Sequence, residues 1–391
     1  MTAHFITAAC FRQTGYSGNH PLAIPRVGTV ERLCQALGWF GPGDAPLECL
    51  PASRAEIERF HMPEYLDAIQ RSEAARGASA EDRARYQIGT LENPVFEGLW
   101  HRAAVSVGGA MLAARLAHQG AVAFHPGGGT QHGLRARASG FCFLNDPVFA
   151  ILTLLDLGRR RVLYVDFDAH HGDGVEAAFL HDPRVMTLSL HEVGRWPFTG
   201  GAEDQGPRRC NLPLPPCLND SEFDRILVQA VLPVARDFAP DAVVVTVGAD
   251  ALQGDPLSSL AITNSRLWAA VETVCALAPA RVVLGGGGYN PWTLGRAWAG
   301  LWARLSGQEI PAQLPKAARA VLASLDCDLV EEEDRAPAWF ATLADPPNPG
   351  PIRPETEALI AATRKRLAAQ DVAFPQNGRA RQRPEQKRTH A

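Results

Sequence analysis

The sequence predicts an α/β protein with a doubly wound, mainly parallel sheet that carries helices on both faces. Short apolar runs recur along the chain and each ends in glycine or a polar loop; they occupy residues 121–124, 162–165, 185–190, 242–247 and 281–284. These runs are nearly continuous in apolar residues, which is typical of strands buried on both faces of a parallel sheet. Segments with helical spacing alternate with the runs, as in proteins built from strand–helix–strand units.

Two of the helical segments have definite limits. Residues 97–118 (EGLWHRAAVSVGGAMLAARLAH) precede the first of these strands, and residues 265–277 (SRLWAAVETVCAL) precede the last. A polar cluster follows each strand, and in chain order the clusters read HPGGGTQHG, DFDAHHGDG, HEVGRW, GADALQGDP and GGGGYN. Ligands of doubly wound sheets bind at the carboxyl ends of the strands. We therefore expect these clusters to form one shared site.

The chain is expected to divide into three parts. Residues 1–345 are predicted to form a single domain that contains all the polar clusters. Residues 346–374 form an extension, which begins with a proline-rich segment (346–354) and continues with residues 355–369, which can form an outer helix. Residues 375–391 are basic and poor in apolar side chains, which predicts a disordered tail.

Composition excludes several classes of protein. The 391 residues are 46% hydrophobic and carry a formal net charge of -4, which indicates a globular protein without overall attraction to nucleic acid or to an anionic membrane. The N-terminus lacks the features of a secretory signal, and no apolar run is long enough to span a membrane, so we expect a cytoplasmic protein. The eight cysteines form no C-x-x-C pair, which favours reduced, structural thiols.

The segment DFDAHHGDG is a candidate cation site. Asp166, Asp168 and His170 alternate at a strand end, so period-two geometry directs them to one face. Carboxylates together with an imidazole suit zinc, iron, cobalt or manganese, whereas calcium and magnesium prefer oxygen ligands alone. In the alternative interpretation these residues only cap the following helix, with Asp173 as the N-cap before GVEAAF. The segment by itself favours neither interpretation.

The other strand ends add candidates of matching chemistry. Asp250 can supply the third protein ligand that a catalytic metal site with an open position requires, whereas Asp255 fits a turn residue in GDP. His132 and Tyr289 lie in glycine-rich loops, and neither loop has the lysine and Ser/Thr of a phosphate-binding P-loop. A metal, a histidine that takes a proton and a tyrosine that stabilises an oxyanion indicate a hydrolase of amides or esters.

The order of the motifs carries a family resemblance. The chain contains, in sequence, GNHPLAIPRV, ENPVFEG, GGGTQHG, SGFCFLND, YVDFDAHHGDGVEAAF, MTLSLHE, WPFTG, GADALQGDP and GGGGYN. In this combination it resembles the histone deacetylase superfamily, specifically the bacterial acetoin-utilisation-like branch, up to about residue 300. The resemblance implies an arginase-like fold with an eight-stranded, mainly parallel sheet, and metal-dependent removal of acyl groups from amines.

The resemblance also implies roles for individual residues. The implied ligands of the catalytic metal, usually zinc, are Asp168, His170 and Asp250. Tyr289 would donate a hydrogen bond to the substrate carbonyl and its oxyanion. His132 would act first as general base and then as general acid, and Asp173 would orient it and raise its basicity.

A structural monovalent cation, typically potassium, is implied beside the metal. The matching positions are the side chains of Asp166 and Ser189 and the backbone oxygens of Asp168, His170 and Leu190. A second, weaker match lies in the backbone near Phe179, Asp182 and Val185. His171 is expected to support the site without binding an ion.

Further matches outline a narrow channel for an acylated lysine. The matching residues of its walls are Gly140, Phe141, Trp196 and Leu257. Glu92, in ENPVFEG, matches a rim carboxylate that holds the backbone amides of the substrate.

Two positions depart from the family pattern. Gln131 stands where the family has the first histidine of a His-His pair, so Asp166 loses its usual imidazole partner. Glutamine cannot carry a proton or a positive charge near the reacting water, which predicts reduced turnover. In WPFTG, Phe198 replaces a glycine, which predicts a different channel mouth and leaves the substrate open.

The sequence therefore supports a zinc-dependent deacylase of acylated lysine in proteins or of small acylated amines such as acetylpolyamines. The alternative is a catalytically impaired protein that keeps its metal and binds acyl-amines, because of Gln131. A two-manganese ureohydrolase is disfavoured by the spacing in DAHHGD and by Tyr289. We expect no membrane partner and no specific nucleic-acid binding, and the oligomeric state stays open.

Overall fold

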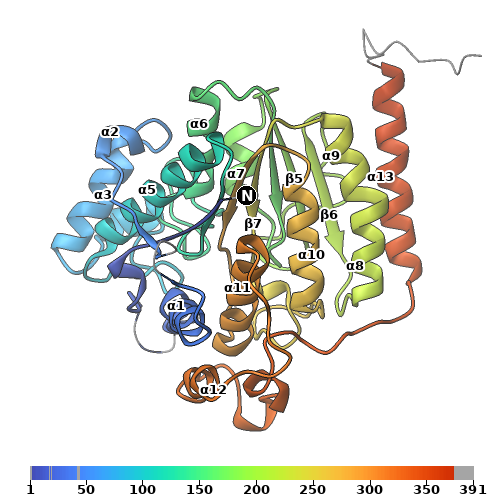
Figure 1. Cartoon of the computed structure of the whole chain (residues 1–391). Helices are drawn as coiled ribbons and strands as arrows, with labels where there is room; N and C mark the ends of the chain where they lie inside the picture. The colour runs from blue at the N-terminus through green and yellow to red at the C-terminus, as the bar shows by residue number, and fades with distance from the viewer. Residues whose placement is uncertain (1, 17, 19, 42–44, 374–391) are drawn as a thin grey trace, which may run out of the picture.

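A sheet of eight strands forms the centre of the protein (Figure 1). The computed structural model describes residues 2–16, 18, 20–41 and 45–373, so the predicted tail at 375–391 lies outside the described residues. The strands are β1 (Ala3–Thr7), β2 (Leu47–Glu48), β3 (Val122–His125), β4 (Val162–Asp166), β5 (Val185–Glu192), β6 (Arg209–Leu214), β7 (Ala242–Thr246) and β8 (Ala280–Leu284). They lie in the order β2-β1-β3-β8-β7-β4-β5-β6, and all neighbouring pairs are parallel.

Helices cover both faces of this sheet, as predicted. The helices are α1 (Arg26–Ala36), α2 (Arg54–Ile57), α3 (Pro63–Ala74), α4 (Ala80–Tyr86), α5 (Leu99–His118), α6 (Asp146–Asp156), α7 (Asp173–Phe179), α8 (Asp220–Ile226), α9 (Leu232–Phe238), α10 (Asn264–Cys275), α11 (Pro291–Ser306), α12 (Lys316–Ala323) and α13 (Pro354–Ala373). Residues of α8 to α11 share one hydrophobic cluster with the sheet, and residues of α5 to α7 share another. Helices α10 and α11 lie in front of the sheet in Figure 1.

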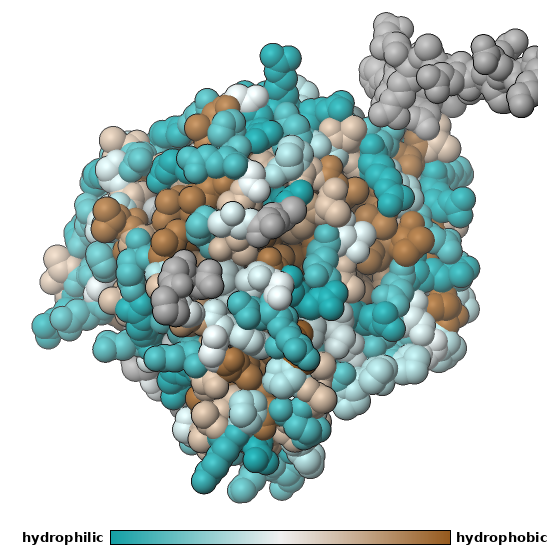
Figure 2. Space-filling model, in the orientation of Figure 1, coloured by the Kyte–Doolittle hydropathy of each residue, from teal (hydrophilic) through white to brown (hydrophobic). Residues whose placement is uncertain are grey.

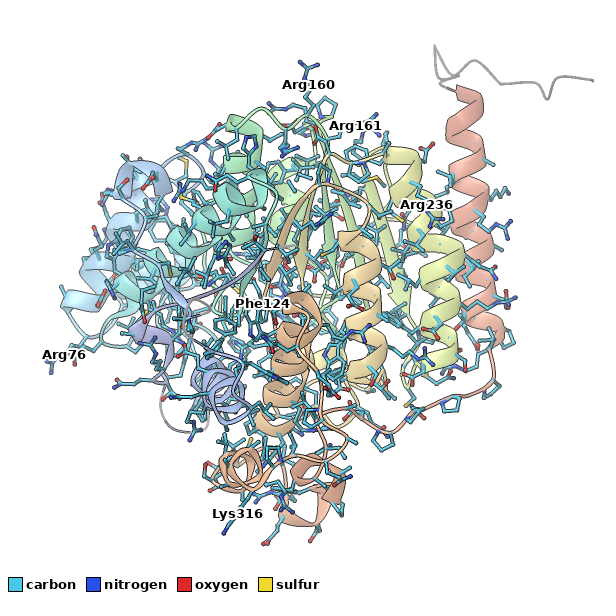
Figure 3. The ribbon with its side chains drawn as sticks, in the orientation of Figure 1. Arg76, Phe124, Arg160, Arg161, Arg236 and Lys316 are labelled. Atoms are coloured by element: carbon cyan, nitrogen blue, oxygen red, sulfur yellow. The ribbon has the colours of Figure 1, made fainter. Side chains whose placement is uncertain are left out.

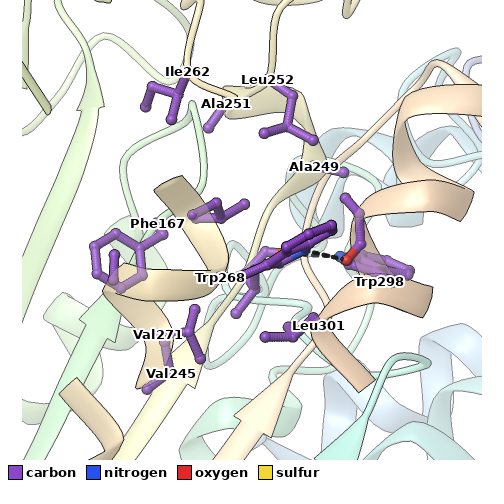
Figure 4. Close-up of a cluster of buried hydrophobic side chains, with 14 of the residues drawn as sticks. Phe167, Val245, Ala249, Ala251, Leu252, Ile262, Trp268, Val271, Trp298 and Leu301 are labelled. Atoms are coloured by element: carbon purple, nitrogen blue, oxygen red, sulfur yellow. Dashed lines mark hydrogen bonds between the residues drawn. The ribbon is translucent and has the colours of Figure 1, made fainter. Parts of the chain in front are cut away.

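Alternation along each strand explains why both faces are buried. In β4, Leu163 and Val165 belong to the cluster beneath α8 to α11, whereas Tyr164 belongs to the cluster beneath α5 to α7. Figure 4 shows part of the first cluster, in which Trp268 of α10 packs near Trp298 of α11. The indole Nε1 of Trp268 donates a hydrogen bond of 2.7 Å to a backbone oxygen of α11, so its polar atom is satisfied in an apolar environment.

The predicted elements are present with small shifts at their ends. The strand predicted at 121–124 lies one residue later, the strand predicted at 185–190 extends to Glu192, and that at 242–247 ends at Thr246. The helices predicted at 97–118 and 265–277 are α5 and α10. Three strands were not predicted: β1, β2, which has only two residues, and β6, in which the polar or half-buried residues Arg209, Asn211 and Pro213 interrupt the apolar run.

The C-terminal helix α13 packs against α8 and β6. Glu222 of α8 is fully buried and accepts hydrogen bonds from the guanidinium of Arg353, with an Nη2–Oε2 distance of 2.7 Å, and from the hydroxyl of Thr356. Burial alone would raise the pKa of Glu222, but the hydrogen bonds from Arg353 and Thr356 lower it to about 2. The charged pair therefore holds the start of α13 against the domain.

Replacing Arg353 by alanine is expected to lower the free energy of unfolding by about 2 kcal/mol, because a buried carboxylate loses its cationic partner. Because the folded pKa of Glu222 lies below its ordinary value of 4.5, this stabilisation is present above pH 4.5 and is lost as the pH falls toward 2. Urea unfolding at pH 7 and at pH 3.5 measures both effects. Arg364→Ala, at an exposed position of helix α13, is the control and should change stability by less than about 0.5 kcal/mol.

The surface shows no concentration of one kind of side chain in the views presented. Hydrophilic residues are interspersed with small apolar patches on the face in Figure 2. Of the basic side chains labelled in Figure 3, Arg160 and Arg161 lie together at one end, whereas Arg76, Arg236 and Lys316 lie at separate places on the periphery, and Phe124 lies in the interior. Within the described ranges no helix is long and apolar enough to cross a membrane. All eight cysteines are free, in agreement with the prediction of unpaired thiols.

Candidate metal centre and substrate pocket

Three buried side chains converge beyond the carboxyl ends of β4 and β7. Asp168 and His170 lie in the loop after β4, and Asp250 lies in a short 3-10 helix (Ala249–Ala251) after β7. One potential ligand atom from each lies within 4.8 Å of the others. His170 Nδ1 is 3.1 Å from Asp168 Oδ1 and 2.9 Å from Asp250 Oδ2. The two strand ends thus bring together the three residues predicted as metal ligands.

The backbone around this Asp168–His170–Asp250 cluster orients the carboxylates. The amide of Ala169 donates to Asp250 Oδ1 at 3.0 Å, and the amide of Gly287 donates to Asp168 Oδ2 at 2.5 Å. A Cβ atom at position 287 would lie 2.0 Å from Asp250 Oδ2, so the GGGGYN loop can approach the cluster only with glycine at this position.

The chemistry of these donors fits a divalent cation. Burial alone would lower the pKa of His170, but its hydrogen bonds to Asp168 and Asp250 raise it to about 10. Burial raises the pKa of Asp250, and the negative charge of Asp168 raises it further. The two buried carboxylates thus stabilise a positive charge at the place where their oxygens lie close to the imidazole. Two oxygens and one nitrogen are a ligand set suited to zinc and to similar metals.

His132 lies beside the cluster and is held by Asp173. The distance from His132 Nδ1 to Asp173 Oδ1 is 2.7 Å, and the rings of His132 and His170 are 6.3 Å apart between centroids. The interpretation of Asp173 as a helix N-cap is wrong: Gly172 is the N-cap of α7, and Asp173 is the first helical residue. Its carboxylate bonds an imidazole instead of the backbone amides that an N-cap would satisfy.

Gln131 lies beside this histidine, whereas Asp166 ends strand β4. Gln131 is buried, and its Nε2 atom lies 3.4 Å from His132 Nε2. Asp166 is directed differently from Asp168 because it is the last residue of β4, and it accepts a hydrogen bond of 2.7 Å from the Tyr164 hydroxyl. The expectation that strand alternation directs Asp166 to the cation cluster is therefore incorrect; the loop after the strand positions the ligands.

Tyr289 is positioned by a residue whose role the sequence did not reveal. Asp255 accepts a hydrogen bond of 2.7 Å from the Tyr289 amide and another of 2.9 Å from the Leu257 amide. The sequence predicted only a turn residue here, yet Asp255 is buried. Burial raises the pKa of the Tyr289 hydroxyl, and the negative charges of Asp250 and Asp168 raise it further. The hydroxyl is therefore protonated at neutral pH and can donate a hydrogen bond.

Arg26 is a second residue that sequence reasoning missed. Its guanidinium donates to the backbone oxygens of Gly286 and Gly287, and it lies 5.0 Å from the ring centroid of Trp298. It also lines a cavity of about 110 Å³, together with glycines of both loops, His132 and Tyr289. A single arginine at the start of a helix carries no signal in the sequence, because its target is backbone that is 260 residues away.

A pocket of about 600 Å³ leads to the cluster. The residues that line it and that the sequence predicted are Glu92, His132, Gly140, Phe141, His170, Trp196, Leu257 and Tyr289. Trp196 packs edge-on against His132 with 4.8 Å between ring centroids, and Phe141 lies 5.9 Å from the ring of Tyr289. Glu92 accepts a hydrogen bond from the Gly140 amide. All five predicted channel and rim residues therefore meet in one pocket.

The residues of the predicted monovalent sites lie near β5. Strand register pairs Asp166 with Ser189, and the Ser189 hydroxyl lies 2.9 Å from His191 Nδ1. Leu190 is buried in the same strand. At the second match, the amide of Asp182 donates to the oxygen of Phe179 at 3.0 Å, and that of Val185 donates to the oxygen of Asp182 at 3.2 Å. His171 lies outside the ligand cluster and bonds Thr199 and Glu176.

At the carboxyl edge of a parallel sheet the structure thus combines a buried Asp-His-Asp cluster with a histidine–aspartate pair, which are groups that a metal-dependent hydrolase requires. The chain belongs to the histone deacetylase family, because the model of the histone deacetylase domain matches residues 20–305. The predicted resemblance is thereby confirmed.

Relatives from bacteria and animals agree with this assignment. Acetoin utilization protein AcuC of Bacillus subtilis (strain 168) is 35% identical over 326 residues, which cover 80% of this chain and 84% of that protein. Histone deacetylase 1 of Homo sapiens is 33% identical over 309 residues, which cover 77% of this chain and 64% of that protein. A histone deacetylase homologue from Aquifex aeolicus has a crystal structure with a TM-score of 0.88 at 33% identity, covering 93% of this chain and 100% of that one. The same values hold for a structure of a homologue in complex with SAHA. The arginase/deacetylase-like fold is therefore confirmed.

Proposed function

We propose that this protein is a zinc-dependent amidohydrolase that removes acetyl or other acyl groups from lysine side chains or small amines. The observation that carries the proposal is the position of the Asp168–His170–Asp250 cluster in the same pocket as His132 and Tyr289. Iron, cobalt or manganese are further candidates for the metal, because they accept the same ligands. We place the catalytic domain at residues 1–345 and the extension at 346–374, in a cytoplasmic protein.

A divalent cation held by the cluster would polarise the amide carbonyl and make a water molecule a better nucleophile. His132 performs the proton transfers: it takes a proton from the attacking water and then delivers it to the departing amine. The bond from Nδ1 to Asp173 places the proton on that nitrogen, which leaves Nε2 as the basic atom, and it stabilises the imidazolium that forms.

Tyr289 stabilises the negative charge that develops on the carbonyl oxygen. Its hydroxyl is protonated, and the Asp255 carboxylate holds its backbone amide, so the donor is oriented before the substrate binds. Phe141 and Trp196 provide apolar walls for the methylene chain of the substrate. Glu92 would accept hydrogen bonds from substrate amides at the rim, and a potassium ion near Asp166 and Ser189 would stabilise the loop after β4.

A deacylation assay on the purified full-length chain tests the proposal. Acetyl-lysine peptides and acetylated polyamines are offered as substrates, and the metal content is determined on the same samples. Activity that a chelator removes and that zinc restores supports a metal-dependent deacylase. Protein that is loaded with metal and inert toward every acyl-amine would refute the activity and would favour the alternative, a metal-retaining protein that only binds acyl-amines.

Changing Gln131 to histidine is expected to raise kcat by at least about tenfold, or ~1.4 kcal/mol of activation free energy. An imidazole at this position can carry positive charge beside His132, whereas the amide of glutamine stays neutral. Steady-state kinetics on one acetyl-lysine peptide measure the change. Gln131→Leu, which has similar size and no charge, is the control and should give no increase. A rise of less than tenfold would mean that glutamine is a tolerated variant.

A further inference from the structure

Phe198 has an unusual backbone conformation at the mouth of the pocket. It lies in the left-handed region with φ of 62°, where a side chain with a Cβ atom is strained and glycine is favoured. Its ring is 75% exposed and lines the pocket that leads to the metal cluster. The protein thus exposes an aromatic side chain to solvent at a position where the backbone conformation favours glycine.

The neighbouring loop imposes this conformation from both sides. The amide of Phe198 donates to the oxygen of Arg195 at 2.8 Å, and the Thr199 hydroxyl lies 2.8 Å from His171 Nδ1. The oxygen of Gly200 lies 2.9 Å from His191 Nε2. Strained residues persist where the surrounding contacts overdetermine them, and such residues are concentrated at binding sites. The backbone of Phe198, from which the ring projects, is therefore held at a defined place on the rim.

Apolar side chains lie beside Phe198 on the rim of the pocket. Val193 also lines the pocket and is 49% exposed, and Leu91, which is 97% exposed, precedes the pocket residue Glu92. The one basic side chain beside Phe198 on this loop, Arg195, is paired with the buried Glu192 at 2.7 Å. Its Nη1 also donates to the oxygen of Leu257, so its charge is already engaged. Exposed apolar side chains that gather at one site mark a contact surface.

We propose that Phe198 is a specificity-determining residue that binds an apolar side chain next to the acylated lysine of a peptide. This inference rests on the proposed function, because the acyl-lysine must occupy the pocket. A flanking leucine or a similar side chain would cover the exposed ring and Val193. An acetylated polyamine offers only methylene groups and ammonium charges. Of the two carboxylates that line the pocket, Glu192 is paired with Arg195 and Glu92 already accepts a hydrogen bond from the Gly140 amide, so both are engaged.

The test compares acetyl-lysine peptides that differ only in having leucine or serine beside the lysine, together with an acetylated polyamine. The wild type is expected to prefer leucine by roughly five- to tenfold in kcat/KM, which is the range expected for one aromatic contact. In Phe198→Gly and in Phe198→Ala this preference should fall to about one. Val228→Ala, at an exposed apolar position far along the chain, is the control and should keep the preference.

A second readout concerns the strain itself. Phe198→Gly should raise the Tm because glycine adopts the left-handed conformation without a steric cost, whereas Phe198→Ala should not. Equal Tm values for all three proteins would contradict the strained conformation.

Binding separates this inference from the proposed activity. The Kd of the leucine and serine peptides is measured by calorimetry on zinc-loaded protein, whether or not turnover occurs. If the leucine peptide binds selectively but is not turned over, the deacylase activity is refuted and the role of Phe198 in binding the flanking side chain is supported. Three outcomes would overturn the role of Phe198. The first is turnover without a preference for leucine, and the second is a preference that Phe198→Gly retains. The third is a fall of kcat/KM in Phe198→Gly that is larger for the acetylated polyamine than for the leucine peptide.

Discussion

Asp250→Ala is expected to lose both the bound divalent metal and deacylation, with kcat/KM reduced by at least about 10³-fold, or ~4 kcal/mol. Asp250 is fully buried and supplies one of the two carboxylates of the cluster, with its Oδ2 atom 2.9 Å from His170 Nδ1. The two residues left, Asp168 and His170, do not form the three-ligand set of a catalytic zinc site. Metal content after dialysis and the rate on an acetyl-lysine peptide measure the two effects.

The control for this variant is Asp250→Asn, which keeps the shape of the side chain and an oxygen for the Ala169 amide. It should also bind metal weakly, because a neutral amide replaces a charged ligand. Circular dichroism of the metal-free proteins verifies that both variants fold. If Asp250→Ala retained one metal per chain, Asp250 would not be a ligand, and the assignment of the cluster as the metal centre would be wrong.

Tyr289→Phe is expected to lower kcat by about 10²- to 10³-fold and to change the Kd of the substrate by much less. The hydroxyl acts where charge develops in the transition state, whereas phenylalanine keeps the ring that packs 5.9 Å from Phe141. The Asp255 carboxylate would still hold the backbone amide, so the loop should keep its place. Single-turnover kinetics and equilibrium peptide binding separate the rate from the affinity.

Tyr65→Phe is the matched control for the loss of a buried hydroxyl. Tyr65 is fully buried, and its hydroxyl donates to the oxygen of Phe143 at 2.6 Å. This variant should lower stability by about 1 kcal/mol without a comparable loss of kcat. A Tyr289→Phe enzyme with nearly normal kcat would show that another donor stabilises the oxyanion.

The predicted part of the fold consists of the strands that are apolar over most of their length. The strands β4, β7 and β8 were recognised because buried parallel strands have no polar face. Strand β6 was missed because Arg209 and Pro213 interrupt its apolar residues, which an edge strand permits. Helix α13 was foreseen as an outer helix, but not the Arg353–Glu222 pair that connects it to α8.

The candidate site was predictable to a similar extent. Polar residues directly after apolar strands indicated a shared site, since the carboxyl ends of parallel strands meet at one edge. The chemistry of Asp168 and His170 indicated a metal, the positions of Asp250 and Tyr289 after other apolar strands made them candidates, and the family resemblance assigned their roles. The support of Tyr289 by Asp255 was not predictable, because a buried aspartate that bonds a distant amide reads as a turn residue in the sequence.

By itself the sequence determined the class of sheet, the edge at which polar residues gather and the types of ligand they offer, because these follow from local periodicity and side-chain chemistry. Only the tertiary structure decided which atoms meet. Asp250 reaches His170 across 80 residues through the register of β4 and β7. The conformation of Phe198 likewise depends on contacts with His171 and His191, which local sequence does not encode. Distances between remote residues depend on register and packing, and those are properties of the folded chain.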